Sequence, residues 1–114
     1  MRRLVITSDA RGDVRAVLLE SRRKFGPLAR ARYRLLIETA YRDLVSDPMR
    51  PGVSAPSDLP ADIRLYPIRH SRARVTREER VGQPRHVIAF RFDESKVEIV
   101  HLLHDGMDLP GRLG

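Results

Sequence analysis

Histidine is the side chain in this sequence best suited to acid–base chemistry near neutral pH, and the chain has 4 of them. They are His70, His86, His101 and His104. His101 and His104 lie three residues apart in an apolar run typical of a strand, so their side chains point to opposite faces of a sheet. We therefore expect neither an acid and base couple nor a pair of metal ligands there, and no metal site in the chain. A lone histidine in such a run is more often structural than catalytic.

Arginine supplies nearly all of the positive charge. The 22 Lys and Arg residues against 15 Asp and Glu give a net charge of +7, and only Lys24 and Lys96 are lysines. Arginine binds carboxylates and phosphates with paired hydrogen bonds and keeps its charge when partly buried. Such a surface suits an anionic partner, either nucleic acid or an acidic protein segment. An arginine-rich soluble surface without a special partner explains the same composition.

The composition excludes several classes of protein. A chain of 114 residues is long enough for one hydrophobic core but not for two, so we expect residues 1–114 to form a single domain. The absence of cysteine excludes disulfides, thiolate metal sites and cysteine nucleophiles. The N-terminal stretch is too polar for a signal peptide or a membrane span, which predicts a cytoplasmic protein with no membrane partner. Nothing in the sequence calls for a cofactor.

The N-terminal half predicts a short strand followed by a helical hairpin. Residues 4–6 are an apolar run, after which Ser8 and Asp9 supply helix-capping oxygens. Apolar residues at helical spacing predict helices over 10–25 and 27–45. The Gly-Pro pair between them ends the first helix and starts the second.

The middle of the chain is harder to interpret. Four of the eight prolines fall in residues 47–62, which predicts a loop. Residues 63–68 alternate as a strand, and Pro67, which lacks an amide donor, places that strand at a sheet edge. The arginine-rich stretch 70–85 fits a solvated hairpin extension better than a short helical turn.

The strongest strand signals are residues 86–92 and 97–103, which predict an antiparallel hairpin. If Phe92 faces Val97, then Arg91 faces Glu98 and Ile88 faces His101. The face predicted to lie beneath the helices consists of His86, Ile88, Phe90, Phe92, Val97, Ile99, His101 and Leu103. The opposite face consists of Val87, Ala89, Arg91, Glu98, Val100, Leu102 and His104. It is too apolar to stand bare in water, so we expect a partner to cover it.

These elements predict an α+β fold: a strand, a two-helix hairpin, then a three-stranded, mainly antiparallel sheet packed under the helices. The order of elements resembles the RelE/ParE superfamily of type II toxin–antitoxin systems, and in particular its ParE-type toxins. The segment ARGDVRAV looks like the family's opening helix motif, A-x-x-D-(L/I/V)-x-x-(L/I/V). DIRLYPIRH resembles its arginine-led second strand, and VEIVHLLHDGMDLPGRL is similar to the ParE-type closing pattern.

The resemblance implies a toxin that is held inactive by a small antitoxin, whose acidic tail wraps around it in a toxin–antitoxin hetero-oligomer. A basic chain with a half-apolar sheet face suits such a tail. The residues expected to contact the antitoxin are Tyr33, Ile37, Arg91, Val100 and Leu102. Ordinary core packing explains Val100 and Leu102 equally well, and it explains Tyr33 and Ile37 better.

ParE-type relatives inhibit DNA gyrase by binding it, which requires no catalytic group, and we prefer this function for the chain. The expected target-binding surface consists of Arg69, Arg72, Arg74, Arg77, Arg80 and Arg112. A solvated charged loop would contain the same arginines without a role.

Two alternatives stay open. RelE-type relatives are mRNA endoribonucleases on the ribosome, and their reaction needs a base, an acid and a cation. His104 and Arg85, which are opposite each other in the predicted register, are the candidates, whereas Arg91 and Glu98 lie roughly 20 Å away at strand rise. A basic nucleic-acid-binding module is the second alternative, although the sequence has no helix-turn-helix, zinc spacing or evident stacking platform.

Overall fold

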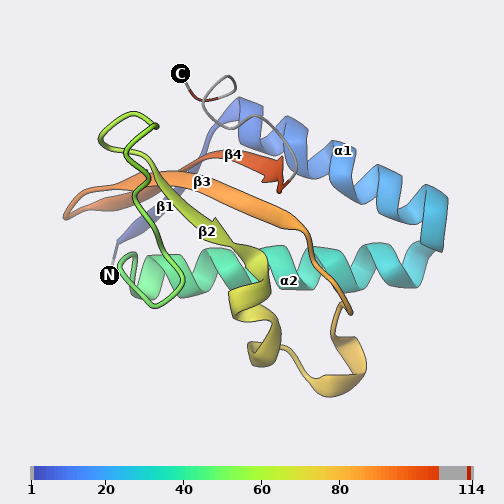
Figure 1. Cartoon of the computed structure of the whole chain (residues 1–114). Helices are drawn as coiled ribbons and strands as arrows, with labels where there is room; N and C mark the ends of the chain where they lie inside the picture. The colour runs from blue at the N-terminus through green and yellow to red at the C-terminus, as the bar shows by residue number, and fades with distance from the viewer. Residues whose placement is uncertain (1, 106–112, 114) are drawn as a thin grey trace.

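The structure is a computed structural model that describes residues 2–105 and Leu113. Its elements in chain order are β1 (Arg3–Ile6), α1 (Ser8–Phe25), α2 (Pro27–Ser46), β2 (Arg64–Pro67), the 3-10 helices η1 (Ile68–Arg74) and η2 (Arg77–Glu79), β3 (His86–Phe92) and β4 (Lys96–His104). The predicted α+β class and the order of its strands and helices are confirmed (Figure 1).

The described strands form one four-stranded mixed sheet in the order β1-β4-β3-β2. β1 pairs with β4 in parallel, and the other neighbours are antiparallel. β1 thus adds a fourth strand to the three predicted to form the sheet. β2 lies at the other edge, as Pro67 predicted, and its outer side carries a single bridge between Leu65 and Ser54.

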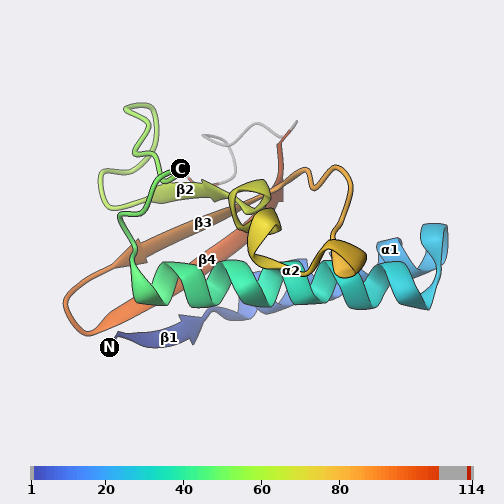
Figure 2. The same ribbon diagram turned by 90° about the horizontal axis from the view of Figure 1, so that it is seen from below.

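The two helices lie together on one face of the sheet (Figure 2). The N-cap of α1 is Thr7, whose Oγ1 accepts a hydrogen bond from the Ala10 amide at 3.1 Å, so the prediction of Ser8 and Asp9 as caps was wrong. The turn between the helices is made by Gly26, whose φ of 92° is accessible at little cost only to glycine. Pro27 then occupies the first turn of α2.

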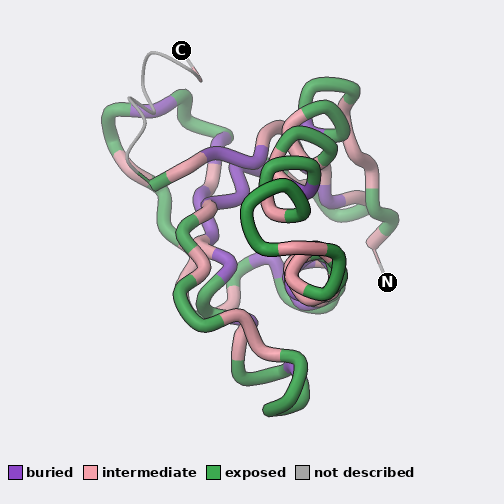
Figure 3. Tube along the Cα trace, turned by 90° about the vertical axis from the view of Figure 1, so that its right-hand side faces the viewer, coloured by how far each residue is buried: buried purple, intermediate pink, exposed green. Residues whose placement is uncertain are grey.

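The main core lies between the helices and the sheet (Figure 3). It consists of buried residues from both helices and the central strands, among them Leu18, Leu36, Ile37, Leu44, Ile88, Phe90, Val97, Ile99 and Leu102. A β-bulge changes which residues reach this core. Phe92 pairs with Val97 and Arg91 with Glu98, as predicted.

For the β3 residues that precede Phe90, the predicted register is wrong. Ala89 pairs with His101 and Ile88 pairs with Leu102, so Val100 is one extra residue on β4. An extra residue reverses the side to which every later side chain points, because the period of a strand is two. Leu102 therefore packs in the helix-side core, and Leu103 lies on the outer face.

The outer face of the sheet is partly covered by the chain itself, which corrects the prediction that it lies open for a partner. Leu59 and Ile63, from the proline-rich segment, pack with Val87, Ala89 and Leu103 in a second buried cluster. The cluster has six buried residues. It forms because residues 47–63 fold back over the β2–β3 side of the sheet, and burying their apolar side chains removes apolar surface from water.

Residues 68–79 form the two 3-10 helices, so the predicted hairpin extension was wrong. A buried polar cluster explains the difference. Ser71 Oγ donates a hydrogen bond to Asp43 Oδ2 on α2 at 2.7 Å and lies 2.7 Å from Tyr66 Oη. Arg50 Nη1 pairs with the same carboxylate at 3.0 Å. The chain leaving β2 is thereby held against α2 instead of extending into solvent.

Candidate functional site

Two grooves on the helix side of the sheet are candidate binding sites. The first, called here the helix groove, has a volume of about 600 Å³ and lies among α1, α2 and β1. Its apolar lining is Leu4, Ile6, Val14, Leu18, Ile37 and Tyr41. Its charged lining is Arg11, Arg15, Arg30, Arg34, Glu38 and Arg42. The helix groove therefore combines an aliphatic floor with five arginines and one carboxylate.

Among the described residues, the helix groove has positive charge that no carboxylate compensates and a tyrosine hydroxyl without a hydrogen-bond partner. Glu38 pairs with Arg34 at 3.2 Å, and the described residues place no carboxylate against Arg15 or Arg30. Tyr41 is 6% exposed, and its Oη has no hydrogen-bond partner among the described residues. Burial raises the pKa of this phenol to about 12, so it stays a donor at neutral pH. A ligand with carboxylates or carbonyls would match both features.

The second groove, called here the histidine groove, has a volume of about 860 Å³. It lies between the α1–α2 turn, the segment 80–86 and the end of β4. Planar rings line it, namely Phe25, Tyr33, His86 and His104, together with the cations Lys24, Arg32, Arg80 and Arg85. Because these residues come from both helices, a loop and two strands, no local sequence pattern marks the groove.

Tyr33 and His86 form a short hydrogen bond, with 2.5 Å between the phenol Oη and Nδ1. Burial, reinforced by the charge of His104, lowers the pKa of His86 to about 4, so this imidazole is neutral at pH 7. Burial raises the pKa of Tyr33 to about 12, so the phenol keeps its proton. Tyr33 must then donate to Nδ1, which leaves the ring proton of His86 on Nε2.

The uninterrupted register predicted that His104 lies opposite Arg85. In the structure His104 lies opposite His86 in the β3–β4 ladder. The two imidazole rings meet edge to face with 5.6 Å between their centroids. His104 and Arg85 are nevertheless brought together by Asp105. Its Oδ1 lies 3.4 Å from His104 Nδ1 and 3.6 Å from Arg85 Nε.

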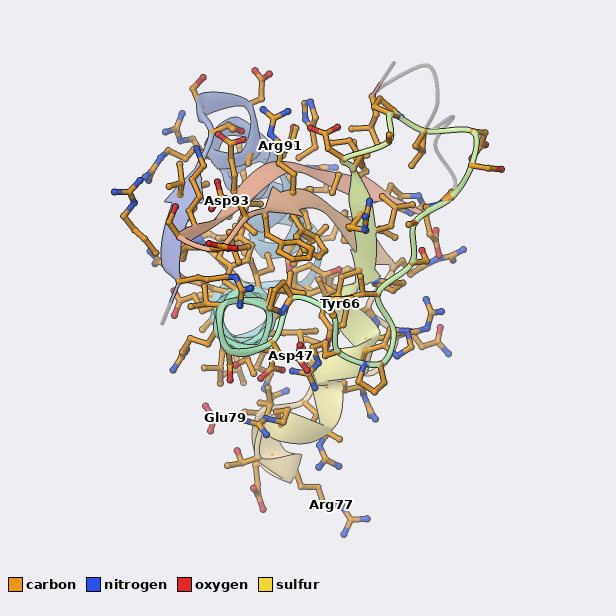
Figure 4. The ribbon with its side chains drawn as sticks, turned by 90° about the vertical axis from the view of Figure 1, so that its left-hand side faces the viewer. Asp47, Tyr66, Arg77, Glu79, Arg91 and Asp93 are labelled. Carbon is orange, nitrogen blue, oxygen red and sulfur yellow. The ribbon has the colours of Figure 1, made fainter. Side chains whose placement is uncertain are left out.

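The arginines predicted to bind the target have different environments. Arg72 donates to the Val81 carbonyl, Arg74 pairs with Asp43 at 3.5 Å, and Arg80 donates to the Val75 carbonyl at 3.0 Å. These three hold the 3-10 segment together. Arg69 and Arg77 are exposed, and within the described part of the chain their side chains make no hydrogen bond or ion pair; Figure 4 places Arg77 at the outer tip of the segment. Arg112 lies outside the described residues.

The residues predicted to bind the antitoxin do not share one surface. Ile37 is at the floor of the helix groove and Tyr33 in the histidine groove. Arg91 projects from the outer face of the sheet, where it pairs with Glu98 and Asp62 (Figure 4). Val100 is the extra residue of the bulge and packs against the outer cluster, while Leu102 is buried beneath the helices.

Sequence reasoning missed two carboxylates. Asp13 Oδ2 accepts hydrogen bonds from His101 Nδ1 at 2.9 Å and from the Leu102 amide at 3.0 Å, and so fixes the bulge. The ARGDVRAV motif contains this aspartate at a fixed place and could have drawn attention to it. Asp43 sits in an ordinary amphipathic helix, and no local signal distinguishes it.

Comparison with known proteins agrees with the order of elements. A family model described as ParE toxin of type II toxin-antitoxin system, parDE, matches residues 4–109. No curated protein matches the chain significantly. Within residues 2–105 and Leu113, no helix combines the length and apolar character needed to cross a membrane. The same residues contain no group of three or more His, Asp or Glu side chains able to hold a metal ion.

Proposed function

The chain belongs to the ParE toxin family, and from that membership we propose that it inhibits DNA gyrase by binding it, as a single toxin domain acting in the cytoplasm. The family match over residues 4–109 carries the proposal. ParE toxins act in pairs with a cognate antitoxin, and we propose that the partner here is a small protein with an acidic tail.

The helix groove is the proposed antitoxin site. An acidic amphipathic segment would place apolar side chains on Ile37 and its neighbours, and its carboxylates on the arginines of the rim. The Tyr41 hydroxyl supports this assignment, since a bound segment would offer it the acceptor that it lacks. Ordering of such a tail costs conformational entropy, which the burial of its apolar face must offset.

The proposed gyrase-binding surface is the outer side of the 3-10 segment. Arg69 and Arg77 are exposed there and available to a protein target, while Arg72, Arg74 and Arg80 support the loop. Inhibition by binding requires a shaped surface and no chemistry at the toxin.

Gyrase, relaxed plasmid and ATP incubated with the purified toxin test this function. We expect the toxin to block supercoiling or trap cleaved DNA, and the double variant Arg69→Gln/Arg77→Gln to lose most of that effect. The variant Arg30→Gln/Arg34→Gln loses the same two charges in the helix groove, so it should still inhibit gyrase but resist neutralisation by the antitoxin. A normal supercoiling reaction with wild-type toxin would contradict the gyrase proposal.

A second candidate function is mRNA cleavage, which one observation favours. His104 and Arg85 lie close together at the histidine groove, where Asp105 contacts both, and an imidazole with a cation can supply proton transfer and charge for phosphodiester cleavage. Mapping of message ends after induction should then reveal ribosome-dependent cuts that disappear in His104→Ala. Intact messages in growth-arrested cells would remove this candidate.

A further inference from the structure

We propose that the histidine groove binds single-stranded nucleic acid, with a base stacked on Phe25 and the phosphodiester backbone held by the cations around it. This proposal requires neither gyrase inhibition nor cleavage of the strand. It rests on three features of the groove: its charge, its exposed aromatic ring and the ring donors at its base.

The groove has an excess of positive charge. Among its described lining residues, Glu20 is the sole acid, and Arg23 and Lys24 already pair with it at 2.8 and 3.1 Å. Arg80 binds only neutral backbone carbonyls, so its charge is not compensated. No carboxylate lies against Arg32 in the part of the chain that the structure describes. Arg32 and Arg80 therefore offer positive charge that no described carboxylate neutralises, and phosphates can bind to it.

Phe25 gives this charged groove a stacking surface. It is the last residue of α1, and its side chain is 75% exposed next to Lys24. A phenyl ring this exposed buries little apolar surface in the protein's own core. Every nucleobase offers a flat π-face to such a ring, and unpaired bases stack there regardless of sequence.

The base of the groove offers hydrogen-bond donors. Because Tyr33 donates to Nδ1 of neutral His86, the Nε2–H of that ring remains a donor. His104 stands beside it, edge to face, at the end of β4. Imidazole donors and planar rings fit base edges and phosphate oxygens.

These features separate the histidine groove from the helix groove and from duplex binding. The helix groove has an aliphatic floor and a buried tyrosine, which fit an apolar peptide face. The histidine groove has an exposed ring instead. Bases in a duplex are stacked on one another and cannot use Phe25, so a duplex would contact only the cations.

Fluorescence anisotropy of the full chain with fluorescein-labelled dT10 and rU10 at 50–200 mM NaCl tests the proposal. We expect Phe25→Ala to weaken binding roughly tenfold, and Arg32→Gln to weaken it several-fold and lower the salt slope by about 1. Arg34→Gln removes the same charge from α2 on the helix-groove side and should leave affinity within about twofold of wild type. Thermal unfolding of each variant checks that it is folded.

Four results would overturn the proposal. One is undetectable binding to both oligonucleotides at 50 mM NaCl. Another is wild-type affinity in Phe25→Ala. The third is an equal loss in Arg34→Gln and Arg32→Gln, and the fourth is equal affinity for a duplex of the same length. Either of these two would mean that net charge alone explains the binding.

Discussion

Asp13 is the residue that fixes the departure of β4 from a regular ladder. The Val100 carbonyl and the Leu102 amide lie just beyond the last β1–β4 pair, and the residues that follow β1 satisfy both. Asp13 accepts from the Leu102 amide at 3.0 Å, and Thr7 Oγ1 donates to the Val100 carbonyl at 2.9 Å. A carboxylate that accepts a buried amide proton forms a charge-assisted bond, which is stronger than a neutral one.

Replacing this carboxylate is expected to destabilise the protein. Asp13→Ala should lower the free energy of unfolding by about 1–3 kcal/mol, because the Leu102 amide loses its acceptor in a part-buried site. Asp9→Ala is the matched control, since Asp9 is 77% exposed and lies 4.0 Å from His101 Nε2; it should change stability by less than about 0.5 kcal/mol. Urea unfolding measures both, and equal losses would contradict the role of Asp13.

His86 is expected to make stability depend on pH. Its pKa of about 4 in the folded protein lies below the ordinary value of 6.5, so the unfolded chain binds more protons between those two pH values. Stability should therefore fall as pH decreases from about 6.5 to about 4, by at most about 3 kcal/mol from this residue. His86→Asn keeps a group that can bond to Tyr33 and should flatten this part of the pH profile in denaturant unfolding. An unchanged slope in the variant would assign the dependence to other groups.

At the level of elements, Asp43 joins α2 to the 3-10 segment. Its carboxylate is 5% exposed and contacts Ser71, Arg50 and Arg74. Asp43→Ala should cost about 2–4 kcal/mol, because it leaves Arg50 without its counter-charge in a largely buried site. Glu38→Ala removes an exposed ion pair from the same helix and should cost less than about 0.5 kcal/mol. Hydrogen exchange should show faster exchange at residues 68–81 in Asp43→Ala only.

Replacement by alanine should have opposite effects on stability at Gly52, which lies in the 47–53 loop, and at Gly12, which lies in α1. Gly52 has a φ of 101°, and a Cβ there would lie 2.7 Å from the His70 ring, so Gly52→Ala should cost about 1–3 kcal/mol. Gly12 lies inside α1 with nothing within 4 Å of an added Cβ, so Gly12→Ala should stabilise by roughly 0.5–1 kcal/mol. Differential scanning calorimetry measures both shifts in Tm. A stabilised Gly52→Ala would mean that the 47–53 loop does not pack on His70.

Periodicity predicted the elements well where neighbouring residues decide the structure. The helices over 10–25 and 27–45 and the strand 86–92 follow from side-chain spacing, and the structure places them within two residues of those bounds. The bulge at Val100 could not be predicted, because the residues that bond to it, Thr7 and Asp13, lie 93 and 89 residues away from their partners in sequence. The 3-10 segment was missed for the same reason, since Ser71 depends on Asp43.

The candidate site was less predictable than the fold. His104 was predicted to face Arg85, but the bulge shifts the pairing by one residue, so His104 faces His86 and Asp105 contacts both His104 and Arg85. The two grooves could not be found at all from the sequence. Each takes its walls from several elements, so its shape exists only after the helices have packed on the sheet.

For the whole molecule, we expect the net charge of +7 to set the association rate constant for an acidic antitoxin. We expect the contacts within the helix groove to set the dissociation rate constant. The molecule extends 38 × 31 × 23 Å, several times the Debye length of about 8 Å at physiological salt. Charges on distant faces therefore act together only at low salt. The association rate constant should fall steeply between 50 and 500 mM NaCl.

Arg30→Glu and Arg77→Glu separate these two effects. Each lowers the net charge from +7 by 2, so each should slow association with the antitoxin several-fold at 50 mM NaCl. Only Arg30→Glu changes the helix groove, so it alone should raise the dissociation rate constant, by about tenfold, and keep that effect at high salt. Biolayer interferometry with immobilised antitoxin measures both rate constants. Faster dissociation from Arg77→Glu than from Arg30→Glu would place the antitoxin on the 3-10 segment instead of the helix groove.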